Sequence, residues 1–405
     1  MTPIINRVRW SASNLAWGIS FDEATGTFSG TPEEAGEYVV PVSVETNYGK
    51  ATQDIKIVVN TPLVLEIEEG DTYPIYVKGT YATSWSKNAA ADADGFRAID
   101  MPFASRLVTL YKGFGARTDD NRWYICADDT SGKNWGYASF SSGNTPKEFP
   151  VENIVDMSTG GYYPGNLYFA YLTSDCTKVL SRKLSSSTAH YTSTRMKIVK
   201  ISQSYSGGFC SLASDGKMYI ARGSFDGDTP SLEIPVNALD IKQIMINDVG
   251  NDNIKTEPYF LTSSGELYQG TEHVSFSGRI KSIYGSTSSI EDVFVVTEDN
   301  LLYAKGYNGS YSLGLSQNSK VYDDFTFVGE FNVKKIEKRS NSCYLLTEDG
   351  KLYHSGTYSS VVCGKHKNFT QVFPDKVFHD ISVPVGIKSA LTEETLIAII
   401  KTDLI

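Results

Sequence analysis

The sequence predicts an all-β protein built from many short strands, and three observations support this class. Aromatic residues are abundant, with 25 Tyr and 19 Phe, and 34 Gly accompany only 14 Pro, a composition that suits strands joined by turns. Short runs rich in Val, Ile and Tyr recur along the whole chain, as strands require. No segment of helical length shows a clean 3.6-residue apolar period.

The length and charge of the chain exclude several classes of protein. At 405 residues it is too long for one ordinary core, so we expect two domains or a repeat array. It has no apolar stretch long enough to cross a bilayer, which predicts no membrane insertion. The formal net charge is −10 and Lys and Arg form no cluster, so we expect no nucleic acid partner.

The five cysteines lie far apart, in odd number and without C-x-x-C spacing. This pattern predicts buried free thiols in a reducing compartment rather than a disulfide framework or a zinc site. The N-terminal residues Met1 to Trp10 lack the apolar core of a secretion signal. With Met1 as the natural start, we therefore expect no export by the usual route.

The first part of the chain reads as a small β-module. Apolar and polar residues alternate over 38–44 and again over 55–59, which is the pattern of half-buried strands. Between them, Asn47-Tyr48-Gly49 predicts a hairpin connection. Two paired strands are expected here.

Segments within residues 18–38 read GISFD, TGTFSGTP and GEY, and together they closely resemble an immunoglobulin-like family found in bacterial surface and phage proteins. The resemblance implies an immunoglobulin-like β-sandwich over residues 1–60. Fewer residues precede Trp10 than the family usually has there. Three alternatives follow: the chain is a fragment, a strand from another subunit fills the open edge, or Ile4 to Arg9 supplies the first strand.

Beyond a connector near Thr61-Pro62, one pattern recurs to the C-terminus. A strand with a charged residue beside Ile is followed by an apolar strand, a turn containing an acid, and a strand ending in Tyr and Gly; the clearest copy spans 333–356. The turn positions that define the units are Asp120, Asp175, Asp215, Ser264, Asp299, Asp349 and Glu393. Asp-Gly and Asp-Asn suit such turns because tight hairpins require positive φ. The chain therefore holds seven units.

Each unit can supply one small sheet that cannot bury both faces alone, and radial packing of such sheets into a propeller solves this problem. The units resemble the propeller repeats of the regulator of chromosome condensation family, best at Gly306 to Gly314, GYNGSYSLG. The resemblance implies a seven-bladed β-propeller over residues 61–405, with Leu63 to Val77 supplying the closing strand.

This chain departs from the same family before the apolar strand of each unit. Where the family often places His, this chain has Gly208, Asp292 and Ser342. None of the surface features on which the family's nucleotide-exchange role depends is matched here. We therefore carry over the fold and not the exchange activity.

No arrangement of residues predicts catalysis, a cofactor or a metal ion. The five histidines are expected to be surface or packing residues, with only His354 in a repeat strand and the others in connecting segments. Carboxylates crowd three loops, around Asp92, Asp226 and Asp248, but none completes a calcium-binding pattern, so we interpret them as solvated acids. Acid pairs such as Glu348-Asp349 recur at equivalent turns, which favours a structural role over glycosidase chemistry.

Loop tyrosines are the candidate binding residues. Flat, partly polar side chains of this kind serve sugar and protein recognition, and filling of strands is the alternative interpretation. The candidates for recognition loops are Tyr162, Tyr163, Tyr307, Tyr311 and Tyr358.

These observations lead to a functional hypothesis. An immunoglobulin-like module without an export signal, free thiols and the lack of a catalytic constellation predict a non-enzymatic bacteriophage virion protein of the tail or fibre, assembled in the host cytoplasm. We expect a homo-oligomer that contacts other virion proteins and a host-surface receptor or glycan. The alternatives are a fragment of a bacterial surface adhesin and a polysaccharide-degrading enzyme on a propeller scaffold. Nucleotide exchange on a small GTPase ranks last.

Overall fold

The computed structural model divides the chain into two compact units, Met1–Leu63 and Val64–Ile405. The residues that it describes are 8–16, 18–30, 32, 34, 36–59, 70–110, 112–127, 143–160, 168–174, 178–183, 190–193, 198–203, 209–214, 216–221, 232–234, 240–246, 258–286, 292–339, 341–357, 362–384 and 394–401. Within these residues, the regular structure is β-strand apart from one helical turn, α1 (Ala82–Trp85), and one 3-10 turn, η1 (Gly309–Tyr311). The predicted all-β class is confirmed.

The first unit forms two antiparallel sheets. A three-stranded sheet has the order β1–β4–β5, and β2 pairs with β3 in a hairpin. The strands are β1 (Arg9–Ala12), β2 (Ile19–Asp22), β3 (Thr27–Gly30), β4 (Gly36–Thr46) and β5 (Gly49–Val59). Strands β4 and β5 pair without interruption along their whole length, so the hairpin predicted at Asn47-Tyr48-Gly49 is confirmed.

The first unit buries few hydrophobic side chains. Among its described residues, only Ala16 and Val40 are buried hydrophobic ones, at 2% and 0% exposure. The indole of Trp10 lies against Gly26, where an added Cβ would come within 2.9 Å of the ring and where φ is +72°. Any side chain at this glycine would therefore displace Trp10.

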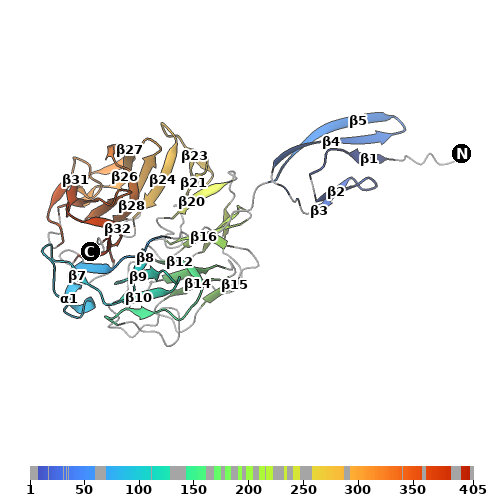
Figure 1. The fold of residues 1–405 in the computed structure, drawn as a ribbon. Coiled ribbons are helices and arrows are strands. Elements are labelled where there is room, and N and C mark those ends of the chain that lie inside the picture. The colour runs from blue at the N-terminus through green and yellow to red at the C-terminus, as the bar shows by residue number, and fades with distance from the viewer. Residues whose placement is uncertain are drawn as a thin grey trace. The chain divides into compact units, whose positions relative to one another are not determined.

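The second unit is a ring of four-stranded antiparallel blades. The described residues form seven such sheets, and the first strands of neighbouring blades contact each other all the way round the ring (Figure 1). The seven-bladed propeller expected from the repeats is therefore present.

The blades take their strands in chain order. The first three blades are β8 (Ala104–Leu110), β9 (Gly113–Thr118), β10 (Trp123–Ala127) and β11 (Lys147–Glu148); β12 (Ile154–Gly160), β13 (Tyr168–Thr173), β14 (Lys178–Lys183) and β15 (His190–Ser193); and β16 (Ile198–Gln203), β17 (Phe209–Ala213), β18 (Met218–Ala221) and β19 (Leu232–Ile234). The next three are β20 (Ile241–Met245), β21 (Tyr259–Thr262), β22 (Leu267–Gln269) and β23 (Glu272–Val274); β24 (Ile280–Gly285), β25 (Val293–Thr297), β26 (Leu301–Tyr307) and β27 (Val321–Glu330); and β28 (Val333–Lys338), β29 (Cys343–Thr347), β30 (Leu352–Gly356) and β31 (His366–Val372).

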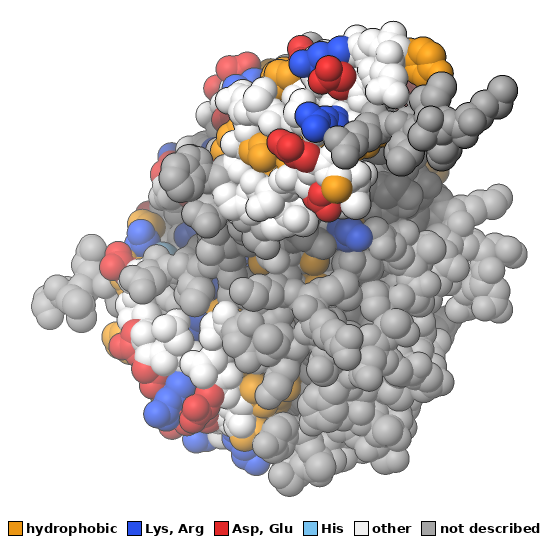
Figure 2. Space-filling view, turned by 90° about the vertical axis from the view of Figure 1, so that its right-hand side faces the viewer, with side chains coloured by type: hydrophobic (Ala, Val, Ile, Leu, Met, Phe, Trp, Pro, Cys, Tyr) orange, Lys and Arg blue, Asp and Glu red, His pale blue; other side chains and the backbone are white. Residues whose placement is uncertain are grey.

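The described surface mixes charges of both signs. In the view of Figure 2, acidic and basic side chains lie interspersed, and hydrophobic side chains come in small groups. No helix among the described residues has the length and apolar character needed to span a membrane.

The seventh blade joins the two ends of the propeller unit. Its strand order is β32 (Val377–Ser382), β33 (Thr395–Lys401), β6 (Ile75–Gly79) and β7 (Arg97–Ala98). Strand β6 pairs with β33 from Ile75, opposite Ile399, to Gly79, opposite Thr395. The closing strand thus begins near the end of the predicted segment, Leu63 to Val77, and extends beyond it.

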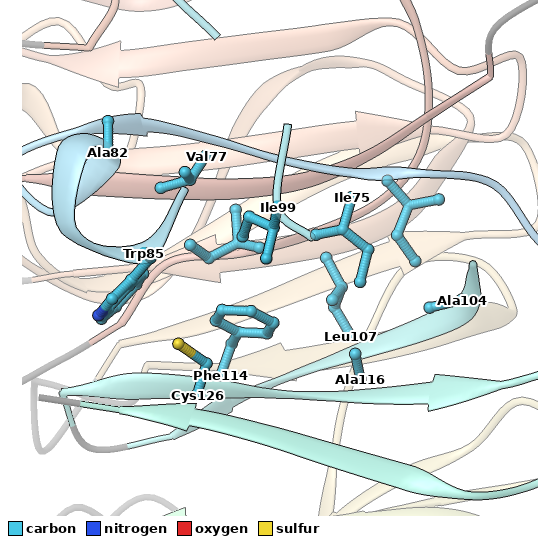
Figure 3. Close-up of a cluster of buried hydrophobic side chains, with 12 residues drawn as sticks. Ile75, Val77, Ala82, Trp85, Ile99, Ala104, Leu107, Phe114, Ala116 and Cys126 are labelled. Carbon is cyan, nitrogen blue, oxygen red and sulfur yellow. The ribbon is translucent and has the colours of Figure 1, made fainter. Parts of the chain in front are cut away.

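A hydrophobic cluster packs the closing strand against the first blade (Figure 3). Ile75 and Val77 of β6 share this cluster with Leu107 and Phe114 of the first blade and with Trp85 of α1, and all five are at most 1% exposed. The rings of Trp85 and Phe114 have their centroids 5.8 Å apart. Burial of side chains this large stabilises the closure, at about 1.5–3 kcal/mol for each aliphatic or aromatic residue.

The turns between the second and third strands of the blades share one design. In the fifth and sixth units, the amides of Leu301 and Lys351 donate to the Thr297 and Thr347 hydroxyls at 3.1 Å. The Thr347 hydroxyl donates to Asp349 Oδ1 at 2.5 Å. The residue after the acid has positive φ, +60° at Asn300 and +82° at Gly350. The structural role predicted for the acids of these turns is confirmed at Asp349.

Candidate functional site

The blade topology gives the propeller two different faces. Since strands alternate in direction, the connections from first to second and from third to fourth strand leave on one face, which we call the loop face. The short turns from second to third strand lie on the opposite face, which we call the turn face. By the strand bounds, connections of the loop face range in length from the two residues 270–271 to the nineteen residues 128–146, and 308–320 is one of the longer ones. Differences between blades are therefore concentrated on the loop face, where binding residues are commonly found.

The connection 308–320 on the loop face is organised around a buried asparagine. Asn308 is 0% exposed, and its amide donates to the carbonyls of Leu315 at 2.8 Å and Gln317 at 2.7 Å. Its side-chain oxygen accepts from the Leu313 amide at 2.9 Å. One side chain thereby satisfies three backbone groups of its own loop, which holds the connection in one conformation.

Two consecutive residues in this loop take the left-handed conformation that disfavours side chains. The φ angles of Ser310 and Tyr311 are +53° and +65°, and such positions cost on the order of 1 kcal/mol or more each. The sixth blade holds them, because the Thr357 amide donates to the Ser310 carbonyl at 2.8 Å and the Ser355 hydroxyl donates to the Tyr311 carbonyl at 2.5 Å. Contacts with the sixth blade thus stabilise this strained conformation of the loop.

Two tyrosines lie at this loop, Tyr307 directly before it and Tyr311 within it. Tyr307 ends β26 with 46% of its surface exposed, and its ring lies over Gly309, where an added Cβ would come within 2.7 Å. Its amide donates to buried Asp292 at 2.9 Å. Tyr311 is half-buried, and the Lys367 ammonium lies 5.6 Å from its ring centroid.

The structure brings two of the five predicted recognition residues together, Tyr307 and Tyr311. Tyr162, Tyr163 and Tyr358 lie outside the described residues. The strands on either side of these three, β12 with β13 and β30 with β31, have their facing ends on the loop face.

Asp292 and Ser342, at positions where the related repeats place His, act as buried structural residues. Asp292 forms an ion pair with Lys338 at 2.9 Å, and both side chains are 0% exposed. The Ser342 hydroxyl donates to Glu394 at 2.7 Å. Gly208 lies outside the described residues. These replacements therefore join neighbouring blades rather than form a reactive centre.

Every innermost strand of the propeller carries a β-bulge at the same place. The register shifts fall between Ala104 and Arg106, Ile154 and Asp156, Ile198 and Lys200, Ile241 and Gln243, Ile280 and Ser282, Val333 and Lys335, and Phe378 and Asp380. In each pair the second residue is polar. A bulge changes the direction of a side chain, so these seven polar residues form an equivalent set around the channel.

Several members of this set hydrogen-bond to the backbone of the next blade. Gln243 donates to the Ile283 carbonyl at 2.6 Å and accepts from the Ile283 amide at 3.0 Å. Lys335 donates to the Ile381 carbonyl at 2.7 Å. Asp380 in turn accepts from the Leu107 amide at 2.6 Å, which joins the last blade to the first.

The central channel has a volume of about 690 Å³, and the residues that line it include four of this set, Arg106, Asp156, Lys335 and Asp380. Arg106 pairs with Asp156 at 2.8 Å, and Lys335 pairs with Asp380 at 2.9 Å and with Glu337 at 3.4 Å. Burial raises the pKa of Glu337. Burial acts to lower the pKa of Lys335, but the neighbouring Asp380 and Glu337 outweigh it and raise this pKa. The channel charges thus pair with one another, which supports a structural role. The sequence shows that charged residues stand beside Ile in the first strands of the repeat units. It does not show the β-bulges that set the direction of the polar side chains.

The prediction for the histidines was partly wrong. His190, His273, His366 and His379 lie in strands rather than in connecting segments. His354 and His366, moreover, contact each other, with their Nδ1 atoms 3.0 Å apart. They meet because β30 and β31 pair with a register shift next to His354, which spacing in the sequence does not reveal.

The buried His354 predicts an acid-sensitive propeller. Burial, together with the neighbouring His366, lowers the pKa of His354 from 6.5 to about 3. The unfolded chain therefore binds this proton first as the pH falls. The contribution of neutral His354 to the free energy of unfolding is complete above about pH 6.5. It is lost as the pH falls toward 3, at about 1.4 kcal/mol for each pH unit.

Urea unfolding measured at several pH values checks this expectation. The His354→Gln variant is expected to lose stability less steeply than the unsubstituted chain below pH 6.5, whereas His273→Gln, at an exposed position, is expected to keep the original slope. Parallel losses in the unsubstituted chain and in His354→Gln would contradict the prediction.

One of the three acidic loops is neutralised within the protein. Lys376 Nζ lies 2.8 Å from Asp92 and 3.1 Å from Asp94. Burial acts to raise the pKa of Asp92, but the Lys376 ammonium and backbone amides outweigh it and lower this pKa. Asp92 is exposed, as expected for a solvated acid, and in addition both acids are ion-paired. The acids at 226–228, 248 and 252 lie outside the described residues. The described part of the chain holds no group of three or more potential metal ligands.

The cysteines are free where the structure describes them. Cys126, Cys210 and Cys343 are buried and Cys363 is half-buried, as the sequence predicts for unpaired thiols. Burial raises the pKa of Cys210 to about 12, so its thiol stays protonated and unreactive at neutral pH. Cys176 lies outside the described residues.

Comparison with known proteins agrees with this architecture. Residues 7–60 match the family described as Putative Ig domain. No curated protein matches the chain. Among solved structures, Prp20p from Saccharomyces cerevisiae is 11% identical, with 84% of this chain and 94% of that chain covered and a TM-score of 0.58.

A second structure of the yeast protein, in complex with Kap60, is also 11% identical, covers 84% of this chain and 91% of that chain, and has a TM-score of 0.59. Human WBSCR16 is 11% identical, with 81% of this chain and 100% of that chain covered and a TM-score of 0.57. Identity this low shows the fold alone. The chain is thus an all-β protein in which an immunoglobulin-like domain precedes a seven-bladed propeller with the fold of the regulator of chromosome condensation family.

Proposed function

We propose that this chain is a non-enzymatic bacteriophage virion protein of the tail or fibre, whose propeller presents loops to a host-surface receptor or glycan and to other virion proteins. The observation that carries the proposal is the strained loop at 308–320, which contains Tyr311 and directly follows Tyr307 at the end of β26 on the loop face. A surface loop that is already fixed in one conformation loses less conformational entropy when a partner binds, and this favours binding.

The chemistry of the loop suits a binding surface. Tyrosine offers a large contact area with few rotatable bonds and a hydroxyl for hydrogen bonding, which serves both sugars and proteins. The exposed ring of Tyr307, the half-buried ring of Tyr311 and the nearby Lys367 ammonium provide apolar, polar and charged contacts within one loop region.

Propellers of similar fold support a role in binding. The structure of yeast Prp20p is described together with its binding to Gsp1p and histones, and the same protein is bound by Kap60. A propeller of this fold thus serves as a scaffold for protein partners in yeast. We extend the scaffold role, and not the identity of those partners, to this chain.

The non-enzymatic part of the proposal rests on the central channel. Five of its charged side chains are engaged with each other, Arg106 with Asp156 and Lys335 with Asp380 and Glu337. A general acid or base needs to reach a substrate with its proton. A polysaccharide-degrading enzyme remains the alternative, and release of reducing sugar from purified host capsule incubated with the protein would establish it.

Loss of the two tyrosines is expected to weaken binding to the host envelope about tenfold or more, in line with aromatic residues at interface centres. The double variant is Tyr307→Ala with Tyr311→Asn, since Asn tolerates the positive φ at residue 311. The measurement is binding of labelled full-length protein to isolated cell envelopes of the host bacterium.

Tyr48→Ala is the matched control, because Tyr48 is 84% exposed in the first unit and is not part of the loop. Equal binding by the double variant and the control would argue against the loop. Mass spectrometry of purified phage particles tests the virion assignment, and finding the chain only in uninfected cell envelopes would favour the adhesin alternative.

A further inference from the structure

Among the described residues of the first unit, one long strand has no partner on its outer side. Strand β5 spans Gly49–Val59 and lies at the edge of the sheet β1–β4–β5 in the described structure. It pairs with β4 over all its residues without a register shift, and it contains no proline. Proteins usually interrupt such an edge with bulges or prolines, because a regular edge is a template for another strand.

The hydrophobic side of this edge is incompletely covered. Ile55 lies opposite Val40 in the ladder, so the two side chains point to the same face of the sheet. Val40 is fully buried, but Ile55 is 39% exposed. Ile55 therefore lies at the boundary of a core that holds few other buried side chains, and additional strand pairing would cover it.

The charges along β5 make it complementary to a second copy of itself. Asp54 and Lys56 flank Ile55 on the opposite face of the sheet. If a second β5 pairs antiparallel about Ile55, each Asp54 lies opposite the Lys56 of the other copy, and the two Ile55 side chains meet. Opposite charges placed directly across strands stabilise the pairing.

Neighbouring registers are less favourable. A two-fold axis at Asp54 places two carboxylates opposite each other, and an axis at Lys56 places two ammonium groups opposite each other. An axis at Gln53 places Lys50 opposite Lys56. Like charges directly across strands destabilise a sheet, so the register about Ile55 is preferred among these.

We propose that two copies of this chain associate through β5, paired antiparallel about Ile55, to form one sheet across both immunoglobulin-like domains. The contact is isologous, since the same strand is used by both copies. It supplies a neighbouring strand at an edge that has none among the described residues, and it does not depend on the function proposed for the loop face.

Charge reversal in the full-length chain tests the pairing. The Asp54→Lys and Lys56→Asp single variants each place like charges opposite each other at two positions, and we expect dimer dissociation constants at least tenfold higher. The Asp54→Lys/Lys56→Asp double variant is again self-complementary and is expected to restore the dimer. Sedimentation equilibrium at several protein concentrations measures all three.

Two controls separate association from folding. Lys56 also pairs with Glu37 of its own chain at 2.7 Å, with both side chains more than half exposed, and Glu37→Gln removes this pair without changing the proposed contact. We expect Glu37→Gln to remain dimeric. A monomeric unsubstituted chain, dimers unaffected by the single variants, or failure of the double variant to recover would each overturn the proposal.

A disulfide provides direct evidence of register. Across an antiparallel pair, facing Cβ atoms lie on the order of 5 Å apart, close to the separation that a disulfide needs. Ile55→Cys is therefore expected to give a covalent dimer on mild oxidation, seen by non-reducing electrophoresis. Tyr48→Cys, at the exposed hairpin tip, is expected to stay monomeric under the same conditions. Equal crosslinking of both variants would overturn the register.

Discussion

Replacing Lys335 with Met is expected to destabilise the propeller by about 3–5 kcal/mol, the cost of leaving a buried ionic partner without its counter-charge. Lys335 joins the sixth blade to the seventh through Asp380 and the Ile381 carbonyl. Its ammonium also lies beside the nearly buried Glu337. The variant leaves both acids in the channel without this cation.

Urea unfolding checks the loss, followed by the fluorescence of Trp85 and Trp123, which are at most 1% exposed in the propeller. The control is Lys242→Met, since exposed Lys242 makes a comparable contact to the Lys281 carbonyl at 3.0 Å. It is expected to cost about 0.5 kcal/mol or less. Equal unfolding midpoints for the two variants would show that the channel pair does not stabilise the ring.

A double variant separates the charge effect from packing. Lys335→Met/Asp380→Asn removes both charges and keeps a side-chain oxygen to accept from the Leu107 amide. Because a buried charge without a partner costs more than a neutral replacement, the double variant is expected to lose less stability than the two single losses added together. The difference is the coupling energy of the pair.

Replacing Asn308 with Ala is expected to cost about 2–4 kcal/mol, since the Leu313 amide and the carbonyls of Leu315 and Gln317 lose their partner in a buried site. The loop 308–320 is then no longer held in its strained shape. We therefore also expect this variant to bind host envelopes as weakly as the variant without Tyr307 and Tyr311.

Hydrogen exchange of the Leu313 amide measures the effect on the loop, and urea unfolding measures the effect on the propeller. Asn318→Ala is the matched control, because Asn318 lies in the same loop and is exposed. Rapid exchange is expected only in Asn308→Ala. Similar exchange in both variants would mean that Asn308 does not organise the loop.

The local structure of the repeats follows closely from the sequence. The Thr-Glu-Asp-Gly turn at 347–350 requires a residue of positive φ at its end and a hydroxyl at its start, and Gly350 and Thr347 supply them. The hairpin at Asn47-Tyr48-Gly49 follows for the same reason. Such features depend on neighbours in the chain, so a pattern of residue types is sufficient to predict them.

Contacts between residues far apart in the sequence could not be predicted in this way. The sequence shows Asn308 in a recognisable repeat motif, but not that its amide satisfies a loop reaching Gln317, or that Ser355 and Thr357 of the next blade hold Ser310 and Tyr311 at positive φ. The meeting of His354 with His366 depends likewise on a register shift between two strands. Each of these depends on pairing geometry that residue types leave open.

The sequence by itself determined that the chain is all-β and that seven units follow a first β-module, because periodic patterns and turn residues act over a few positions. That this module is immunoglobulin-like was implied by its resemblance to a known family. Only the tertiary structure decided that the closing strand is Ile75–Gly79 and which residues of β33 it faces, that bulged polar residues join successive blades, and that β5 lies at an edge of its sheet among the described residues. These depend on which strands become neighbours in space. The contacts that stabilise these arrangements join residues as far apart in the sequence as Leu107 and Asp380.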